Sequence, residues 1–104
     1  MVERYLFVKL LPEHSTEKGR ARAAREASLL SSAEGEGVLS VRIGVPADAA
    51  AVAAWDLSVA LRFESLELAD RFIEGPVYRG FTEVFLGEHG RVLKAWTFEI
   101  QTGA

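Results

Sequence analysis

The hydrophobic positions change period several times along the chain, and each change marks an expected element. Residues 2–10 alternate with period two, which predicts a strand whose two faces are both largely apolar. Ser15 or Thr16 can then cap a helix that continues to about residue 30. Small residues at helical spacing would let this helix pack closely on a sheet. The expected buried stripe consists of Ala21, Ala24, Ala27 and Leu30.

The middle of the chain returns to alternation on either side of an alanine-rich loop. After breaks at Gly35 and Gly37, residues 38–45 are expected to form a second strand. Residues 46–54 are typical of a loop with room for one helical turn. Residues 56–63 alternate cleanly between apolar and polar positions, which predicts a third strand.

A second helical region and a last strand complete the pattern. Ser65 is a good N-cap for a helix. The buried stripe of this helix is expected to consist of Leu66, Ala69, Phe72 and Ile73. Gly75 and Pro76 break the helix. The apolar face beyond the break consists of Phe81, Val84 and Phe85. With a strand at residues 91–100, the order is βαββαβ, which predicts a ferredoxin-like α+β sandwich.

Two helices can cover only one face of a four-stranded sheet. The second apolar face of residues 2–10, together with Trp96 on the last strand, then needs another cover. A second copy of the sheet is the simplest cover, because two-fold dimers are the commonest oligomers, and the pair would form a dimeric α/β barrel. The alternative is a monomer with some exposed apolar surface. We expect the homodimer, since monomers usually expose only small apolar patches.

Composition narrows the class of partner. The net charge of −3 and the pI near 5.4 argue against a nucleic-acid backbone as partner. Arginines do cluster at positions 20, 22 and 25, but Glu17 and Glu26 flank them, which is typical of a solvated helix face.

With 104 residues, the chain is expected to form a single domain over residues 1–104. It has no cysteine, which excludes disulfides and thiolate chemistry and fits a cytoplasmic protein. Its first apolar run is too short to span a bilayer and lacks a signal-peptide cleavage site, so no membrane partner is expected.

Three segments are similar to a known family. Residues 3–12 read ERYLFVKLLP, residues 55–72 read WDLSVALRFESLELADRF, and residues 75–78 read GPVY. Together they resemble the Dabb family, the stress-responsive dimeric α/β-barrel domains, which have an HPxH element in place of GPVY. The resemblance covers nearly the whole chain and consists mostly of hydrophobic patterning. It implies the same fold, a homodimer, and a pocket between helices and sheet.

Family members include lyase-type cyclases of linear polyketides and small stress-induced proteins. The closing histidine of HPxH, which is the acid–base group of the cyclases, corresponds to Tyr78. A first-strand histidine of the same pocket corresponds to Arg4, and an aromatic residue of the second helix corresponds to Phe72. The chain's own histidines, His14 and His89, fall at no family site. Histidine catalysis is therefore not carried over.

The resemblance implies a cofactor-free cyclase, lyase or isomerase for a small hydrophobic, polyketide-like or aromatic substrate. Tyr78 and Arg4 are the candidate catalytic residues. A guanidinium beside the tyrosine would favour the phenolate and offer a fork to a carboxylate, enolate or thioester oxygen. The candidate substrate contacts are Phe72, Phe81, Leu57 and Leu6.

Two other functions stay open at this point. One is a non-catalytic, small-molecule-binding or stress-response dimer, and the other is a cofactor-free monooxygenase like those of antibiotic biosynthesis. In a purely structural interpretation, the Tyr78 ring caps the pocket and Arg4 pairs with a glutamate such as Glu99. Most of the aromatic residues would then be core: Trp55, Phe72, Phe81, Phe85 and Trp96.

Asp56 and the two histidines are the remaining polar candidates. Asp56 could line a dimer cavity, orient Arg62 or Arg42, or cap the loop before the third strand. His14 and His89 show no HxH or HxxxH spacing, so no metal site is expected.

Overall fold

A computed structural model describes residues 1–33 and 37–101 of the chain. The strands are β1 (Val2–Leu10), β2 (Val38–Gly44), β3 (Leu57–Phe63) and β4 (Gly90–Glu99). The α-helices are α1 (Glu17–Ser28), α2 (Ala49–Ala54), α3 (Leu66–Ile73), α4 (Pro76–Arg79) and α5 (Leu86–His89). The other helical segments are the 3₁₀ helices η1 (Pro12–His14) and η2 (Leu29–Ala33) and the π-helix η3 (Gly80–Phe85).

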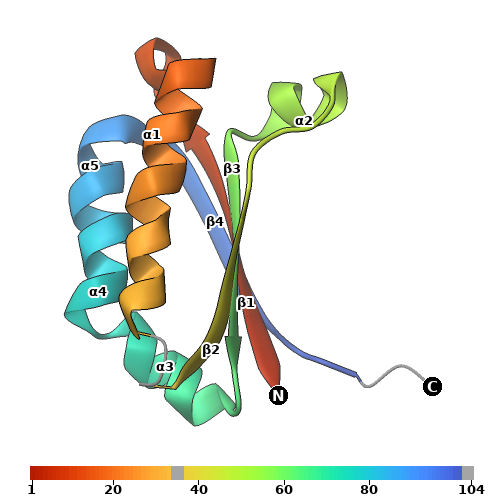
Figure 1. Cartoon of the computed structure of the whole chain (residues 1–104), viewed down its shortest axis with the longest axis vertical. Helices are drawn as coiled ribbons and strands as arrows, with labels where there is room; N and C mark the ends of the chain where they lie inside the picture. The colour runs from red at the N-terminus through yellow and green to blue at the C-terminus, as the bar shows by residue number, and fades with distance from the viewer. Residues whose placement is uncertain (34–36, 102–104) are drawn as a thin grey trace.

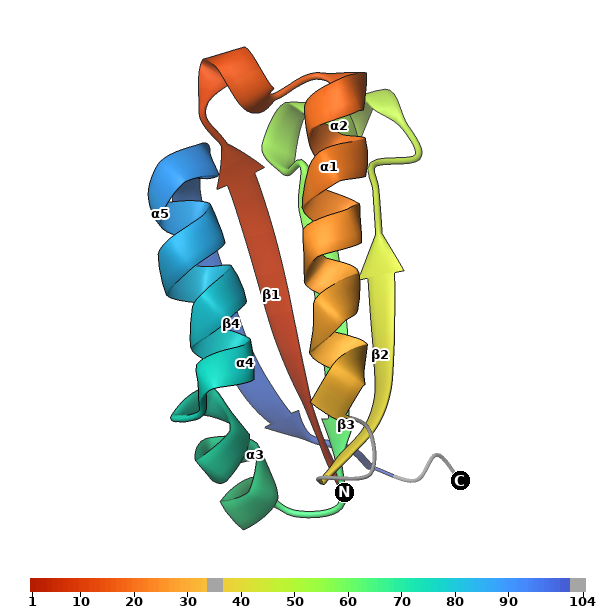
Figure 2. The same cartoon turned by 60° about the vertical axis from the view of Figure 1, so that its left-hand side comes forward.

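The strands form one antiparallel sheet in the order β2-β3-β1-β4. Helix α1 and the run from α3 to α5 lie side by side on one face, and α2 projects to the other side (Figures 1 and 2). The predicted ferredoxin-like α+β sandwich is confirmed.

The predicted break at Gly35 lies outside the described residues. Within those residues, no helix is long and apolar enough to cross a membrane.

The core lies between the sheet and the layer formed by α1 and α3 to α5. Successive side chains of a strand point to opposite faces, so one alternate set from β1 and one from β3 face these helices. The large side chains of this set that are almost completely buried are Leu6, Val8, Leu10, Leu57, Val59, Leu61 and Phe63. Each contributes about 1.5–3 kcal/mol by leaving water, which anchors the helices to the sheet.

Three predicted stripes were wrong at single positions. In α3, Leu66 is 54% exposed, because it is the first residue of the helix. In α1 the buried residues are Ala23 and Ala27, whereas Ala21 is exposed. Nine residues make about two and a half helical turns, so Ala21 cannot share a face with Leu30. In η3, Val84 is 68% exposed. The wider turn of a π-helix rotates this residue outward.

The open face of the sheet carries a cluster of aromatic side chains. Tyr5 packs edge-on against Phe98, with ring centres 5.8 Å apart. Phe7 packs against Trp55 at 5.7 Å and Trp96 at 6.4 Å. About half of the Trp96 and Phe98 surfaces stay exposed, at 50% and 53%. The two tryptophans therefore belong to this face and form no common wall with the helical phenylalanines.

Asp56, just before β3, is completely buried and joins three segments. Its Oδ2 accepts a hydrogen bond of 2.8 Å from the backbone N–H of Leu10. Its Oδ1 accepts bonds of 2.8 Å from Ser15 Oγ and 2.9 Å from Arg20 Nε. The carboxylate thus ties the end of β1 to the beginning of α1, and the arginine that it holds is on a helix rather than on a strand.

Burial alone would raise the pKa of Asp56. The hydrogen bonds from Leu10, Ser15 and Arg20, with the charge of Lys9, outweigh burial and hold the pKa below its usual range. Because the folded-state pKa is the lower one, the ionised carboxylate stabilises the fold above the unfolded-state pKa of about 3.9. That stabilisation is lost as the pH falls through the folded-state pKa.

We expect Asp56→Asn to lower the free energy of unfolding by about 3 kcal/mol at pH 7, because Arg20 and two neutral donors lose their anion. The measurement is urea unfolding from pH 7 down to about pH 3, where the wild type should lose more stability than the variant. Asp48→Asn is the control, since Asp48 caps the exposed α2 and asparagine caps a helix equally well. Parallel pH curves for wild type and Asp56→Asn would contradict this role.

Candidate functional site

Arg4 and Tyr78 meet in the layer between the helices and the sheet. Arg4 shares the helix-covered face of β1 with Leu6. Tyr78 lies in α4, the single turn that begins at Pro76. The Nε of Arg4 donates a hydrogen bond of 2.9 Å to Tyr78 Oη, and the guanidinium carbon lies 5.6 Å from the ring centre. Two residues far apart in the sequence thus form one polar pair inside the fold.

Thr97 holds the guanidinium from the sheet side. It lies directly opposite Arg4 on β4, and its Oγ1 accepts a hydrogen bond of 2.9 Å from Arg4 Nη1. Arg4 forms no ion pair with Glu99, the partner of the structural interpretation, within the described part of the chain.

Two donor groups of the pair, Arg4 Nη2 and Tyr78 Oη, donate to no protein atom in the described part of the chain. Tyr78 Oη accepts from Arg4, so its own proton remains available to another acceptor. A guanidinium N–H and a phenol O–H held side by side suit a single carbonyl or carboxylate oxygen.

Aromatic neighbours shield Tyr78 from solvent. Only 5% of the residue is exposed, and its ring packs edge-on against Phe72 with centres 5.8 Å apart. Phe72 packs in turn on Phe63, at 5.6 Å. A ligand that reaches Tyr78 Oη from the helical side must therefore displace Phe72.

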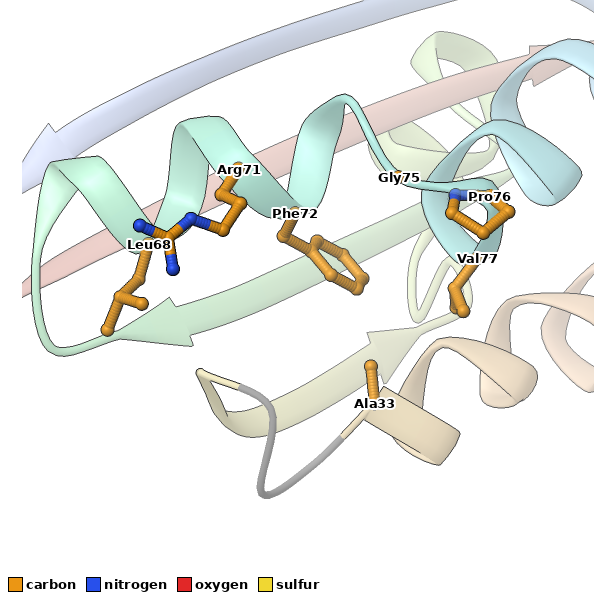
Figure 3. A pocket seen from close by; sticks show the side chains of 7 residues that line it. All are labelled: Ala33, Leu68, Arg71, Phe72, Gly75, Pro76 and Val77. Carbon is orange, nitrogen blue, oxygen red and sulfur yellow. The ribbon is translucent and has the colours of Figure 1, made fainter.

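Phe72 also borders an apolar cavity of about 290 Å³ at the junction of α3, α4 and η2. The cavity is lined by Ala33, Leu68, Arg71, Phe72, Gly75, Pro76 and Val77 (Figure 3). The side chains of Phe72 and Val77 point toward Ala33 across it (Figure 3). Arg71 supplies the charge among the lining residues; its guanidinium is mostly exposed and pairs with Glu67 at 3.0 Å. The cavity therefore suits an apolar body with an anionic end.

The four predicted substrate contacts separate in the structure. Phe72 lies between the Arg4–Tyr78 pair and the cavity. Phe81 borders a second hollow of about 380 Å³ between η2 and η3, which meets the first at Val77. Leu6 and Leu57 are core residues, and Leu57 also borders a hollow beneath α2 on the other side of the sheet. Their contact with a substrate stays a prediction.

The two histidines meet in the structure, which the sequence analysis did not predict. The rings of His14 and His89 lie 4.5 Å apart, and His89 stacks on Phe85 at 4.4 Å. A signal was available in the topology. Because β1 and β4 pair antiparallel, the segment after β1, which contains His14, lies beside the segment before β4, which contains His89. No group of three or more His, Cys, Asp or Glu side chains that could hold a metal ion occurs in the described ranges.

No protein-family model matches the sequence, and no curated protein matches it. A dimeric ferredoxin-like protein of Thermobifida fusca matches the fold with a TM-score of 0.77 at 14% identity, over 95% of this chain and 90% of that one. A protein of Arabidopsis thaliana gives 0.76 at 13% identity, over 100% and 99%. A Deinococcus radiodurans protein, provisionally described as an antibiotic biosynthesis monooxygenase, gives 0.70 at 14%, over 100% and 96%. These likenesses show the fold.

We expect Tyr78→Phe to lower the free energy of unfolding by about 1–2 kcal/mol, because Arg4 Nε loses its acceptor while the ring contact with Phe72 remains. Thermal unfolding should show this as a melting temperature lower by several degrees. Tyr5→Phe is the matched control on the other face of the sheet. Its hydroxyl makes only a long bond of 3.3 Å to Glu3. Equal losses in the two variants would contradict a special role for the Arg4–Tyr78 bond.

Proposed function

We propose that this protein is a cofactor-free cyclase, lyase or isomerase that acts on a small hydrophobic substrate with a carbonyl or carboxylate group. The observation that carries the proposal is the hydrogen bond from Arg4 to Tyr78, which leaves the phenol proton and the two N–H groups of Arg4 Nη2 without a protein acceptor among residues 1–33 and 37–101. The resemblance of residues 1–104 to a single Dabb domain supports the same class of reaction.

The pair would act on a substrate carbonyl in two ways. The Tyr78 hydroxyl and Arg4 Nη2 would bind the carbonyl oxygen, which makes the neighbouring C–H more acidic. When the proton moves from Oη to that oxygen, the Nε–H of Arg4 stabilises the phenolate left behind. The phenolate then removes the acidic C–H proton, which leaves the substrate as its enol and restores the Tyr78 hydroxyl. The low exposure of Tyr78 strengthens each of these interactions.

The apolar body of the substrate would occupy the cavity beside Phe72. A volume of about 290 Å³ is at the lower end for ligand pockets, so it suits a small molecule. Movement of the Phe72 ring would join this cavity to the Tyr78 hydroxyl. Arg71, at the α3 side of the cavity, could pair with an acidic end of the same molecule.

One comparison favours a second function. The neighbour from Deinococcus radiodurans is provisionally described as an antibiotic biosynthesis monooxygenase. On that model, the Arg4–Tyr78 pair would bind a phenol substrate, stabilise its phenolate, and leave oxygen to react with the electron-rich ring without a cofactor. A non-catalytic, ligand-binding stress protein would use the same pair and cavity but turn nothing over.

We also propose that two copies pair through their open sheet faces to form a homodimer. The half-exposed Trp96 and Phe98 support this, as do structural neighbours described as dimeric. The absence of cysteine fits a cytoplasmic location.

We expect small aromatic and polyketide-like acids to raise the melting temperature of the wild type, and of Tyr5→Phe, but not of Tyr78→Phe or Arg4→Lys. A ligand at 100 times its Kd should add about 2.7 kcal/mol to the free energy of unfolding. Arg4→Lys keeps the charge but lacks the fork of donors. A thermal-shift screen measures this, and chromatography of each stabilising compound after incubation detects turnover.

Oxygen uptake measured in the same incubations separates the candidate reactions. Product without oxygen uptake supports the cyclase, lyase or isomerase, and uptake with a phenol supports the monooxygenase. Stabilisation without product indicates a binding protein. If all four proteins shift alike, the ligand binds elsewhere and the proposed site is wrong.

The homodimer predicts a sedimentation mass of twice the 11.4 kDa chain. Phe98→Glu should give the single-chain mass, because it places a carboxylate at the centre of an apolar contact. Val84→Glu, on the helical surface, is the matched control and should stay dimeric. A wild type that stays monomeric at every concentration would contradict the homodimer.

A further inference from the structure

The open face of the sheet has large aromatic side chains on β4 and β1 and small side chains on the neighbouring strand β3. The register of the strands places these side chains in rows that cross the sheet. One row consists of Trp96, Tyr5, Ala60 and Arg42, and the next consists of Lys94, Phe7, Ser58 and Gly44. In both rows the bulk lies on β4 and β1, whereas β3 carries only a small side chain.

The side of the face formed by β2 and β3 is hollowed. A groove of about 310 Å³ is lined by Tyr5, Phe7, Arg42, Ile43, Gly44, Ser58, Val59 and Ala60. Its floor is close to Gly44, where a Cβ would lie 2.6 Å from Ser58 Oγ and would force this hydroxyl to turn. Across the same face from this groove stands Trp96, with half of its surface exposed. One face thus carries both a projection and a hollow.

A two-fold axis parallel to the strands reverses the order of the strands within each row, so that the β4 end of a row in one copy faces the β2 end of the same row in the other. It sets β4 of one copy over β2 and β3 of the other, so that a projection meets a hollow at both ends of the interface. An axis across the strands would instead set Trp96 against Trp96 of the partner subunit and leave both grooves empty. Packed sheets lie about 10 Å apart, a spacing that large side chains fill best when small ones face them.

We propose that Trp96 of each subunit fills the groove above Ala60 and Arg42 of the partner subunit, in a homodimer whose two-fold axis runs parallel to the strands. This inference rests on the proposed homodimer and specifies its geometry. Arg42 pairs with Glu3 at 2.8 Å, and its largely exposed guanidinium could lie against the incoming indole. Tryptophan and arginine are the residue types that most often dominate an interface.

Truncation of the projection is the first test. In sedimentation at a series of concentrations, Trp96→Ala should raise the Kd of the dimer about 100-fold, since each dimer loses two such contacts. Val92→Ala is the control on the same face of β4, in a different row, and should raise the Kd less than about threefold. Similar effects of the two variants would overturn the proposal.

Filling the groove is the second test. Ala60→Trp should abolish the dimer by a clash with Trp96 of the partner subunit, and the double variant Ala60→Trp/Trp96→Ala should recover it. Ala60→Trp/Val92→Ala should not recover it. Circular dichroism checks the fold of each variant, and Ala60→Leu replaces Ala60→Trp if that variant is unfolded. A wild-type dimer with no rescue overturns the Trp96 contact alone, whereas a monomeric wild type overturns the homodimer itself.

Discussion

The central strand β1 carries large apolar side chains on both of its faces, and the two faces need different covers. In this topology β1 and β2 are parallel, as are β3 and β4, and helical crossovers join the members of each pair. Such crossovers have one hand, so both helical segments come to the same side of the sheet. The two crossover segments therefore bury one face of β1, whereas the other face stays open apart from the end beside α2. The covered face becomes the core and holds the candidate site, whereas the open face is the surface through which we propose the homodimer.

The covered face of β1 also contains a charge. Arg4 shares that face with Val2 and Leu6, and a guanidinium in such a layer must be hydrogen-bonded. Tyr78 and Thr97 meet this requirement, so the Arg4–Tyr78 bond alone fits a structural role as well as a catalytic one. Among the described residues, Arg62 Nε is the buried side-chain atom without a partner, so the unused Nη2 of Arg4 reaches solvent, where a ligand oxygen could replace water. Ligand binding, rather than the hydrogen bonds within the protein, therefore separates the two roles.

Much of the fold was predictable because it depends on local patterns. The period of apolar residues located all four strands, and Thr16 and Ser65 capped α1 and α3 as expected. The meeting of Arg4 with Tyr78 followed from the family resemblance rather than from spacing. Neither the resemblance nor the residue spacing could predict that Phe72 lies between the cavity and Tyr78. That arrangement depends on how the side chains pack in three dimensions.

The features that escaped prediction depend on contacts between distant segments. Asp56 is the clearest case: its partners Ser15 and Arg20 become neighbours only after α1 folds back along the sheet. The contact between His14 and His89 likewise requires β1 and β4 to be paired first. The outward turn of Val84 depends on a π-helix, a form that sequence periodicity does not distinguish from an α-helix.

Strand β4 connects the candidate site with the open face. Because side chains alternate, Thr97 points toward Arg4 while its neighbours Trp96 and Phe98 point away from the core. This strand is an edge strand, hydrogen-bonded in the sheet to β1 alone. A partner packed on Trp96 would give it a second restraint and would fix the position of Thr97 against the guanidinium. Dimer formation would thus order the Arg4–Tyr78 pair through the position of Thr97 on β4.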